Sequence, residues 1–480
     1  MLPRNLHVWL LFLTAFHVCG RYFPAAAAAS PPNIVIILCD DLGYGDLECY
    51  GHPTIKTPHL NQLASEGIRL TDCYSAAPIC SPSRAGLLTG RTPTRSGIYS
   101  WIAEGNPMNL KKDETTLATL LKRAGYDTCL SGKWHLNGLF NNPAQTQPSD
   151  HGFDHWFSTQ NNAHPSHENP DNFVRNGKET GPIQGYSCQI VVDEAAQWLR
   201  ERQEKNRPFF LHICFHETHE PVASPDRLVQ QYPEAKGRGE ALYEANVTNM
   251  DHATGRLMKV LDELQIAENT LVFFTSDNGP ETLNRYKNAW RSWGSPGPLR
   301  GMKLHMYDGG IRVPGILRWT GRITAGQTSS VPVSSVDLLP TICELAGIPL
   351  PTSKVLDGTS LVPFLSGKPI QRKKPLFWHY YGGTDNRQVA LREGDWKLVA
   401  WWDQPQKMST GTSLSPGVVP LIKKSRLAGF ELYHISEDVS EQHNLAEQEP
   451  ERLKKMAQQA EQFYAEVIKE GPYWFPEDRP

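Results

Sequence analysis

Acidic side chains follow two strand-like runs of this sequence and form a candidate metal site. Asp40 and Asp41 stand at the end of one run, and Asp277 and Asn278 stand at the end of another. Each pair alone has an ordinary explanation, because aspartate and asparagine are common in turns. If both runs are parallel strands, their carboxyl ends meet at one edge of the sheet, where ligands bind. Three carboxylates and one amide oxygen suit Ca²⁺ or Mg²⁺ better than Zn²⁺.

A second segment that could do chemistry begins at Cys80 and reads C-S-P-S-R-A-G-L-L-T-G-R. Its structural interpretation is a loop cysteine before a helix, with Ser81 or Ser83 as the N-cap. The segment also resembles the signature of the type I, formylglycine-dependent sulfatases. That resemblance implies that a maturation enzyme oxidises Cys80 to formylglycine. One hydroxyl of the hydrated aldehyde would attack sulfur to give a covalent sulfo-enzyme, and the second would expel the sulfate.

The chain also contains the cationic groups that a sulfate ester needs as negative charge develops on its oxygens. They are Lys133 and His135 in G-K-W-H, His219 in F-H-E-T-H-E-P and Lys303 in L-R-G-M-K. Each alone could be a solvated lysine or a hydrogen-bonded core histidine. The resemblance implies that Lys133 and Lys303 bind the sulfate, and that His219 and Lys303 protonate the leaving alcohol. It further implies that His135 is a general base for the second hydroxyl, and that Arg84 pairs with the nucleophile region.

The resemblance extends over nearly all of the chain after its N-terminal segment. It includes C-D-D-L-G-Y-G-D near the start, H-G-F-D-H-W-F in the middle, and A-L-R-E-G-D-W-K-L-V with E-L-Y-H-I in the tail. It assigns the four oxygen ligands to one Ca²⁺ site that an oxygen at residue 80 completes, with Mg²⁺ as the alternative. The sequence departs from the family at Glu217-Thr218, Met302 and Asp308. We expect these departures to alter local packing or the rim of the pocket.

The substrate is indicated less sharply than the reaction. The layout most resembles N-acetylgalactosamine-6-sulfatases and arylsulfatase-like bacterial enzymes, which implies a sulfated saccharide as substrate. Asn161, Asn162 and His164 lie in the segment 160–167 and are candidates for binding sugar hydroxyls. Three aromatic residues of the tail could stack on sugar rings or simply pack the small sheet: Tyr380, Trp401 and Trp402.

Two other functions stay open at this point. Phosphodiesterases and phosphonate monoester hydrolases belong to the same superfamily, and some carry the Cys-x-Pro-Ser-Arg motif. Phosphoryl chemistry on this scaffold commonly uses two metals with several histidine ligands, whereas the sequence indicates one metal set. A secreted glycan-binding protein that has lost catalysis is the third interpretation. The presence of every expected catalytic residue argues against it.

Composition narrows the class of protein. The 480 residues are 39% hydrophobic and 21% charged, with a formal net charge of −3, as in an ordinary packed globular protein. A nearly neutral chain does not fit a nucleic-acid binder that works through a general basic field. The nine cysteines form no Cys-x-x-Cys pair, which disfavours zinc. Cys39 and Cys214 lie in strand-like runs and are expected to be small buried residues.

The N-terminus reads as an export signal. Arg4 precedes the apolar run 8–16, and small residues fill 25–30. We therefore predict a signal peptide over 1–29 and a secreted or periplasmic protein, in preference to a lysosomal-type compartment. The apolar run is too short to span a bilayer, and no later segment is apolar for long enough.

Strand-like runs alternate with helical patterns through the first three quarters of the chain. This alternation predicts an α/β domain with a large, mostly parallel sheet flanked by helices, and the resemblance implies the alkaline-phosphatase-like sulfatase fold. We place this catalytic domain at 30–370 and a smaller C-terminal domain at 371–480, with an antiparallel sheet and a closing helix over 450–469. The predicted strands of the large sheet are 33–39, 208–215 and 270–275, and the predicted helices are 58–67, 115–124, 188–205 and 242–264.

Overall fold

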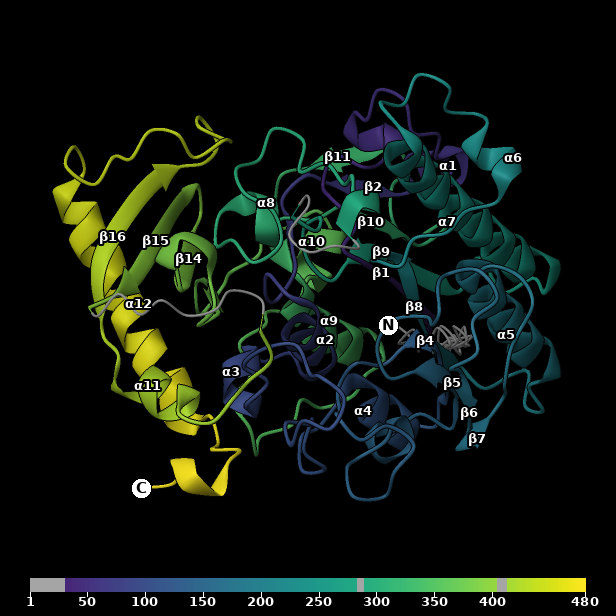
Figure 1. The fold of residues 1–480 in the computed structure, drawn as a ribbon, viewed down its shortest axis with the longest axis horizontal. Helices are drawn as coiled ribbons and strands as arrows, with labels where there is room; N and C mark the ends of the chain where they lie inside the picture. Colours follow the sequence, from purple (N-terminus) through teal and green to yellow (C-terminus); the bar gives the residue numbers. More distant parts are fainter. Residues whose placement is uncertain (1–30, 283–288, 404–411) are drawn as a thin grey trace, which may run out of the picture. The chain divides into compact units, whose positions relative to one another are not determined.

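The computed structural model describes residues 31–282, 289–403 and 412–480, so the predicted signal peptide at 1–29 lies outside the described residues. Residues Pro32–Pro480 form one compact unit that contains a large sheet and a small one (Figure 1). Among the helices in these ranges, none has the length and apolar character that a bilayer crossing requires. The eight cysteines in these ranges are all free.

The large sheet has ten strands in the order β11-β2-β10-β9-β1-β8-β4-β5-β6-β7. Its central five strands, from β9 to β5, are parallel, while β10 and β6 run antiparallel to their neighbours. This confirms the predicted α/β class with a mostly parallel sheet. The strands are β1 Asn33–Asp40, β2 Ile68–Leu70, β4 Asp127–Lys133, β5 His155–Thr159, β6 Val174–Arg175, β7 Lys178–Glu179, β8 Phe209–Thr218, β9 Thr270–Ser276, β10 Gly315–Arg318 and β11 Gln327–Ser329.

Strand β1 shows why the apolar runs are continuous. Ile34, Ile36 and Leu38 enter one hydrophobic cluster, and Val35, Ile37 and Cys39 enter another, because successive side chains point to opposite faces. Helices cover both faces, so neither face needs polar residues. One face is covered by α1 Pro58–Ser65, α5 Ser187–Glu201 and α7 Arg238–Glu263, and the other by α2 Cys80–Thr89, α4 Leu117–Arg123 and α9 Leu338–Leu345.

Short elements complete this part of the chain and connect the longer ones. A two-stranded parallel sheet joins β3 to β12 just before helix α2. Short helices occur at the ends of several loops. These elements are β3 Cys73–Tyr74, β12 Val333–Ser334, α3 Pro93–Ser96, α6 Asp226–Val229, α8 Asp308–Ile311 and α10 Val362–Leu365.

The tail forms the predicted small antiparallel sheet with a closing helix. Its strands are β13 Leu376–His379, β14 Val389–Glu393, β15 Trp396–Trp402 and β16 Leu427–His434, and the helix is α12 Pro450–Glu470. The connection between β15 and β16 includes a further helix in its described part. It contains α11 Val418–Lys424, because the apolar residues after Gly417 pack inward and Pro420 falls in the first turn, where it removes no helical hydrogen bond.

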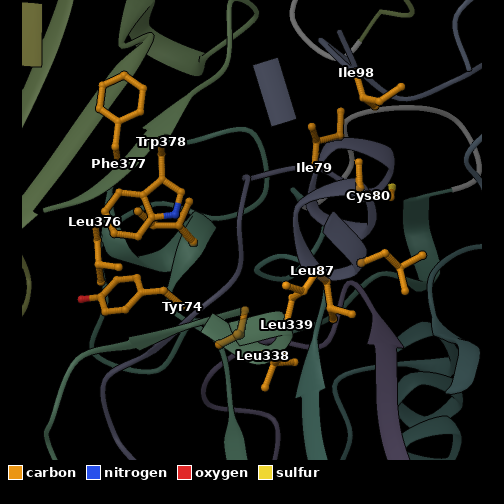
Figure 2. Close-up of a cluster of buried hydrophobic side chains, with 14 of the residues drawn as sticks. Tyr74, Ile79, Cys80, Leu87, Ile98, Leu338, Leu339, Leu376, Phe377 and Trp378 are labelled. Carbon is orange, nitrogen blue, oxygen red and sulfur yellow. The ribbon is translucent and has the colours of Figure 1, made fainter. Parts of the chain in front are cut away.

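The small sheet packs against β3 and the residue after it, just before helix α2. Trp378 of β13 lies against Tyr74 of β3, with ring centroids 5.1 Å apart (Figure 2). The indole Nε1 of Trp378 donates a hydrogen bond of 2.8 Å to the carbonyl of Ser75. Tyr380 and Trp402 are also buried, so the packing interpretation is correct for both. The tail therefore supports the part of the catalytic domain that carries the candidate nucleophile.

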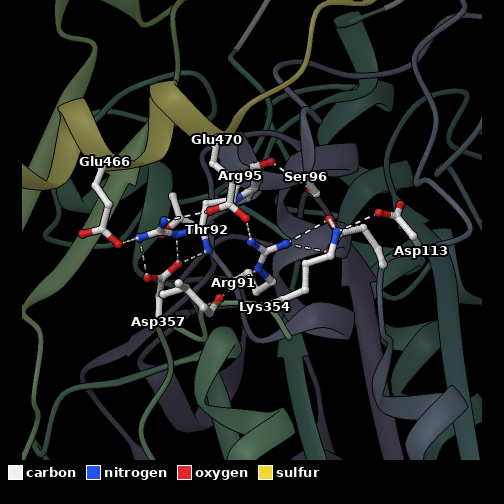
Figure 3. Close-up of polar contacts among 12 residues, drawn as sticks. Arg91, Thr92, Arg95, Ser96, Asp113, Lys354, Asp357, Glu466 and Glu470 are labelled. Atoms are coloured by element: carbon white, nitrogen blue, oxygen red, sulfur yellow. Dashed lines mark hydrogen bonds and ion pairs between the residues drawn. The ribbon is translucent and has the colours of Figure 1, made fainter. Parts of the chain in front are cut away.

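An ion network around the buried guanidinium of Arg95 attaches helix α12 to helix α3 (Figure 3). The guanidinium of Arg95, which is 1% exposed, contacts Asp357 at 2.8 Å, Glu466 at 2.7 Å and Glu470 at 3.0 Å. Arg91 lies beside it and pairs with Glu470 as well. Buried charges are tolerated only when they are paired and hydrogen-bonded, so the buried Arg95 and Asp357 depend on each other.

Replacing Arg95 should therefore destabilise the protein. We expect Arg95→Ala to lower the free energy of unfolding by about 3 kcal/mol, because it leaves the buried carboxylate of Asp357 without its main partner. The matched control is Lys259→Ala, which removes an exposed partner of Glu263 and should cost no more than about 0.5 kcal/mol. Urea denaturation followed by circular dichroism measures both. Equal midpoints for the two variants would show that the network contributes nothing.

Candidate active site

The predicted oxygen ligands emerge together at one edge of the large sheet. Strands β1 and β9 are parallel and pair Cys39 with Ser276, so the residues that follow each strand meet. The amide of Asn278 donates a hydrogen bond of 2.7 Å to Asp41 Oδ1, and the backbone N–H of Asp41 donates to Asp277 Oδ1 at 3.3 Å. Asp41 adopts a left-handed backbone conformation with φ of 62°, which is uncommon outside glycine.

Each of the three carboxylates pairs with one of the predicted cations. All six residues are buried, with at most 2% of each residue's surface exposed. Such pairs survive burial only with close, hydrogen-bonded geometry. The nitrogen-to-oxygen distances are 2.5 Å for Lys133 and Asp40, 2.7 Å for Lys303 and Asp41, and 2.7 Å for Arg84 and Asp277.

Cys80 is the first residue of helix α2 and lies at this same place. Its Sγ and one oxygen each of Asp40 and Asp277 lie within 4.8 Å of one another, and Sγ forms a similar group with Asp41 and His219. The helix N-terminus adds a positive partial charge next to Cys80. The structure therefore places Cys80 beside all the carboxylates that the sequence assigned to it.

The N-cap interpretation of the serines after Cys80 is wrong. The N-cap residue is Ile79, which makes no side-chain cap, and Ser81 and Ser83 are inside the helix. Ser81 Oγ instead accepts a hydrogen bond of 3.1 Å from the N–H of Ile102. The serine thus connects the helix to a neighbouring loop, which a sequence pattern of local caps could not indicate.

The unmodified thiol of Cys80 is a weak nucleophile in this environment. Burial raises its pKa to about 12, although Lys303 and Lys133 act in the opposite direction. At neutral pH the sulfur therefore carries its proton. Cys80 is 3% exposed, and every residue of α2 is buried.

The oxygen atoms at the sheet edge fit a hard divalent cation. Within the described ranges, Asp40 Oδ1 and Asn278 Oδ1 are buried and accept no hydrogen bond. Each of these oxygens can only accept hydrogen bonds, and buried acceptors in proteins seldom lack a partner. Burial together with Asp40 and Asp41 raises the pKa of Asp277 to about 7, and a bound cation would relieve this crowding of negative charge. The donor set matches the oxygen ligands of Ca²⁺ or Mg²⁺.

His135 is set up as a neutral base. Its Nε2 lies 3.2 Å from the carbonyl oxygen of Ile102, which can only accept, so Nε2 carries the hydrogen and Nδ1 has the lone pair. Burial, then the charges of Lys133 and Arg84, hold its pKa well below the ordinary histidine value. Gly132, three residues before His135, has φ of 111° and lies so close to Cys214 that a Cβ atom would overlap the carbonyl of that residue.

His219 and Lys303 flank Asp41 but differ in charge. His219 Nε2 lies 3.6 Å from Asp41 Oδ2, and its Nδ1 lies 2.8 Å from the carbonyl oxygen of Glu220. Burial and the charge of Lys303 lower the pKa of His219. Burial also acts to lower the pKa of Lys303, but Asp41 and other acidic neighbours hold it well above its usual value. Of the two predicted proton donors, Lys303 therefore carries its proton at neutral pH before any anion binds.

The predicted sugar-binding residues line a hollow of about 830 Å³ beside this centre. Asn162 reaches the centre itself, because its Oδ1 accepts a hydrogen bond of 3.3 Å from Lys133 Nζ. Asn161 and His164 line the same hollow. Among the described residues, His164 makes no hydrogen bond or ion pair to the centre, so the structure brings only Asn162 into direct contact with it.

The sequence analysis missed residues that position the centre. Glu281 Oε2 lies 3.5 Å from Lys303 Nζ. Its position three residues after the predicted metal ligand Asn278 could have indicated that it lies near the centre. Thr218 Oγ1 donates a hydrogen bond of 3.2 Å to the backbone carbonyl of Asp41 and contacts the hydroxyl of Tyr243 at 2.9 Å. Thr218 is one of the residues at which the sequence departs from the family, and it contacts the backbone of Asp41.

The departure at Asp308 affects packing away from the centre. Its Oδ1 lies 2.7 Å from the Nζ of Lys397 on β15, and its Oδ2 accepts a hydrogen bond of 2.9 Å from Tyr74. Burial would raise the pKa of Asp308, yet Lys397 and Arg312 lower it to about 2. The carboxylate therefore stays charged and connects α8 and β3 to the small antiparallel sheet.

Comparison with known proteins agrees with this geometry. A model of the sulfatase family matches residues 32–348, and a model described as N-sulphoglucosamine sulphohydrolase, C-terminal, matches residues 302–410. N-acetylgalactosamine-6-sulfatase of Rattus norvegicus is 36% identical over 82% of this chain and 76% of its own length. Arylsulfatase A of Homo sapiens is 35% identical over 87% of this chain and 84% of its own length.

Solved structures show the same fold. The PsFucS1 sulfatase from Pseudoalteromonas sp. aligns with a TM-score of 0.75 and 26% identity, over 92% of this chain and 91% of that one. The phosphonate monoester hydrolase of Agrobacterium radiobacter aligns with a TM-score of 0.61 and 20% identity, over 92% and 96% of the two chains, and shares the fold alone. The chain has the alkaline-phosphatase-like fold, and it belongs to the sulfatase family of sulfuric ester hydrolases.

Proposed function

We propose that this sulfatase removes sulfate from a carbohydrate ester through formylglycine made from Cys80, with Ca²⁺ bound at the sheet edge. The observation that carries the proposal is the position of the Cys80 sulfur. It lies within 4.8 Å of carboxylate oxygens from the ends of β1 and β9, among three buried cations. Carbohydrate as the substrate class is supported by the similarity to N-acetylgalactosamine-6-sulfatases.

The cations around Cys80 suit the binding of a sulfate group. Lys133 and Lys303 are desolvated, so their charges act strongly on an anion that enters the same space. Each is held by a carboxylate within 2.7 Å, which fixes its position before substrate arrives. Preorganised charge of this kind stabilises the oxygens of the sulfate as the ester bond breaks.

Named residues of this chain can donate or accept each proton that moves in the reaction. When a hydroxyl at residue 80 attacks sulfur, it gives its proton to Asp277, the ester S–O bond breaks, and the leaving alcohol takes a proton from Lys303 or His219. The second hydroxyl at residue 80 then gives its proton to Nδ1 of His135 while the C–O bond to sulfate breaks and the aldehyde returns. Addition of water to the aldehyde restores the hydrate for the next turnover. His135 suits this step because its Nδ1 has a free lone pair.

The metal would be held by the oxygens of Asp40, Asp41, Asp277 and Asn278 together with the oxygen at residue 80. When bound, it supplies Lewis-acid charge to the nucleophile and to the sulfate. Among the described residues, Asp40 Oδ1 and Asn278 Oδ1 accept no hydrogen bond, so both oxygens have lone pairs that a cation could use.

The maturation enzyme has to act before the chain folds. Cys80 is 3% exposed and lies in a helix whose ten residues are all buried, so no second enzyme could reach it in the folded state. Conversion during export would satisfy this requirement. The predicted signal peptide at 1–29 is consistent with such a route and with a secreted or periplasmic enzyme.

A phosphodiesterase of the same fold remains the competing enzyme. One observation favours sulfate. Within the described ranges, both groups of candidate metal ligands share Cys80 and so describe one location, whereas phosphoryl transfer on this scaffold commonly uses two metals. Turnover of an aryl sulfate against an aryl phosphodiester compares the two activities directly.

The first prediction concerns the nucleophile. Cys80→Ala should lower aryl sulfate turnover on the order of a thousandfold or more and leave the circular dichroism spectrum unchanged, because it removes the reacting group. The control is Cys49→Ala, which should keep full turnover. Cys49 is half-buried, and its backbone carbonyl accepts a hydrogen bond from Arg69 of β2. Peptide mass spectrometry of active protein should find formylglycine at residue 80. An unmodified thiol in fully active protein would refute the proposal.

The second prediction concerns the metal. Asp277→Ala should abolish both Ca²⁺ binding and turnover, because it removes a ligand and leaves Arg84 without its carboxylate. Isothermal titration with Ca²⁺ measures the binding, and Asp262→Ala on the exposed surface of α7 is the control that should bind normally. A chelator should inactivate the wild-type protein, and added Ca²⁺ should restore it. Normal Ca²⁺ binding by the Asp277 variant would remove that residue from the site.

The third prediction concerns the base. His135→Ala should release one equivalent of alcohol and then stop, because no group remains to accept the proton of the second hydroxyl. Rapid-quench kinetics would show the burst, and mass spectrometry would find a sulfo group on the peptide that contains residue 80. His443→Ala replaces an exposed histidine and should turn over normally. Steady turnover by the His135 variant at the wild-type rate would exclude this role.

A further inference from the structure

The hollow beside Lys133 has a composition quite different from that of the centre. Six of its fifteen lining residues carry side-chain amides, and none is lysine or arginine. The hollow begins at Asn162, whose Oδ1 accepts the hydrogen bond from Lys133. The hollow thus adjoins Lys133, and a substrate whose sulfate reaches this lysine can extend along its surface. The amides are Asn141, Asn142, Gln160, Asn161, Asn162 and Asn172.

Two of these amides hold the backbone around the hollow through hydrogen bonds, and another has an acceptor atom without a partner among the described residues. Gln160 Nε2 donates to the carbonyls of Ile102 and Asn137, and Asn172 connects His164 N–H to the carbonyl of Asn162. In the described part of the chain, Asn161 Oδ1 is buried and has no hydrogen-bond partner. A neutral hydroxyl is the donor that such an acceptor fits without a charge penalty.

The charged residues of the hollow are all acidic. Glu104, Asp171 and Glu179 line it with exposed carboxylates. No ion pair connects any of these three to a basic side chain that the structure describes. A uronic acid or a second sulfate in the hollow would meet like charge, which disfavours binding.

We propose that this hollow binds an uncharged saccharide unit next to the sulfated one, so that the enzyme acts on sulfated glycans whose adjoining sugar carries no anionic group. The inference rests on the proposed carbohydrate sulfatase activity and specifies its substrate class. The cationic centre selects the sulfate, and the hollow selects against further charge. The amides hydrogen-bond the hydroxyls of the neutral sugar.

The test uses two disaccharides that differ in one group. The sulfated monosaccharide that the holoenzyme hydrolyses is identified first, and it is then linked to galactose in one disaccharide and to galacturonic acid in the other. We expect kcat/KM to be at least about tenfold higher for the galactose compound at low ionic strength. Added KCl should narrow this ratio, because salt screens exposed carboxylates.

Neutral variants test the residues responsible. The triple variant Glu104→Gln, Asp171→Asn, Glu179→Gln should bring the ratio of the two kcat/KM values close to one. Glu437→Gln, whose side chain is 81% exposed elsewhere on the surface, should leave the ratio as in the wild type. A wild-type ratio of one, or a ratio that the triple variant does not change, would overturn the inference. Failure to hydrolyse any sulfated monosaccharide or aryl sulfate would instead overturn the proposed function on which it rests.

Discussion

Three buried ion pairs at the carboxyl ends of β1, β4 and β9 are the constraint on which the rest of the structure depends. Lys133 with Asp40, Lys303 with Asp41 and Arg84 with Asp277 bring six charges out of water, and each ion removed from water costs several kcal/mol even after relaxation. Close geometry has to offset that cost. The carboxyl ends of these strands fix the positions of the charged groups. Thr218 hydrogen-bonds the backbone carbonyl of Asp41, which has a left-handed conformation. The same pairing positions the oxygen atoms and the cationic groups on opposite sides of each ion pair around Cys80.

This constraint extends outward to the tail. Helix α2 carries Cys80 and Arg84 into the centre, and because all ten of its residues are buried, it has to be enclosed on every side. The sheet β13–β16 supplies part of the enclosure through the cluster that contains Trp378. Helix α12 is attached in turn by the ion network around Arg95. Residues 371–480 therefore serve the catalytic geometry even where they lie away from the reacting atoms.

Much of this organisation could be predicted from the sequence, for physical reasons. The runs around Ile34 and Phe273 predicted buried strands because both faces of a parallel sheet exclude water, and acidic residues after such strands predicted a common edge. The rest depends on contacts between distant segments. The bond from Ile102 to Ser81, the approach of Glu281 to Lys303 and the packing of α11 arise only when the chain has folded. Local propensity cannot indicate them, because no short stretch of sequence contains both partners.

The groups on the two sides of Lys133 differ in charge and in burial. On one side of this residue the groups are buried, paired and cationic toward an incoming anion, and on the other side they are amides with exposed carboxylates beyond. Electrostatic attraction acts on the sulfate alone, since a neutral sugar has no net charge to be drawn in. The hydrogen bonds of the hollow are short-ranged and act only after the sulfate has arrived. Long-range attraction and short-range recognition are therefore separated in space, and a molecule with a single anionic group can satisfy both in only one orientation. Asn162 stands at the boundary, with its carbonyl oxygen on the lysine and its backbone carbonyl bonded to Asn172, and so couples the two halves of the site.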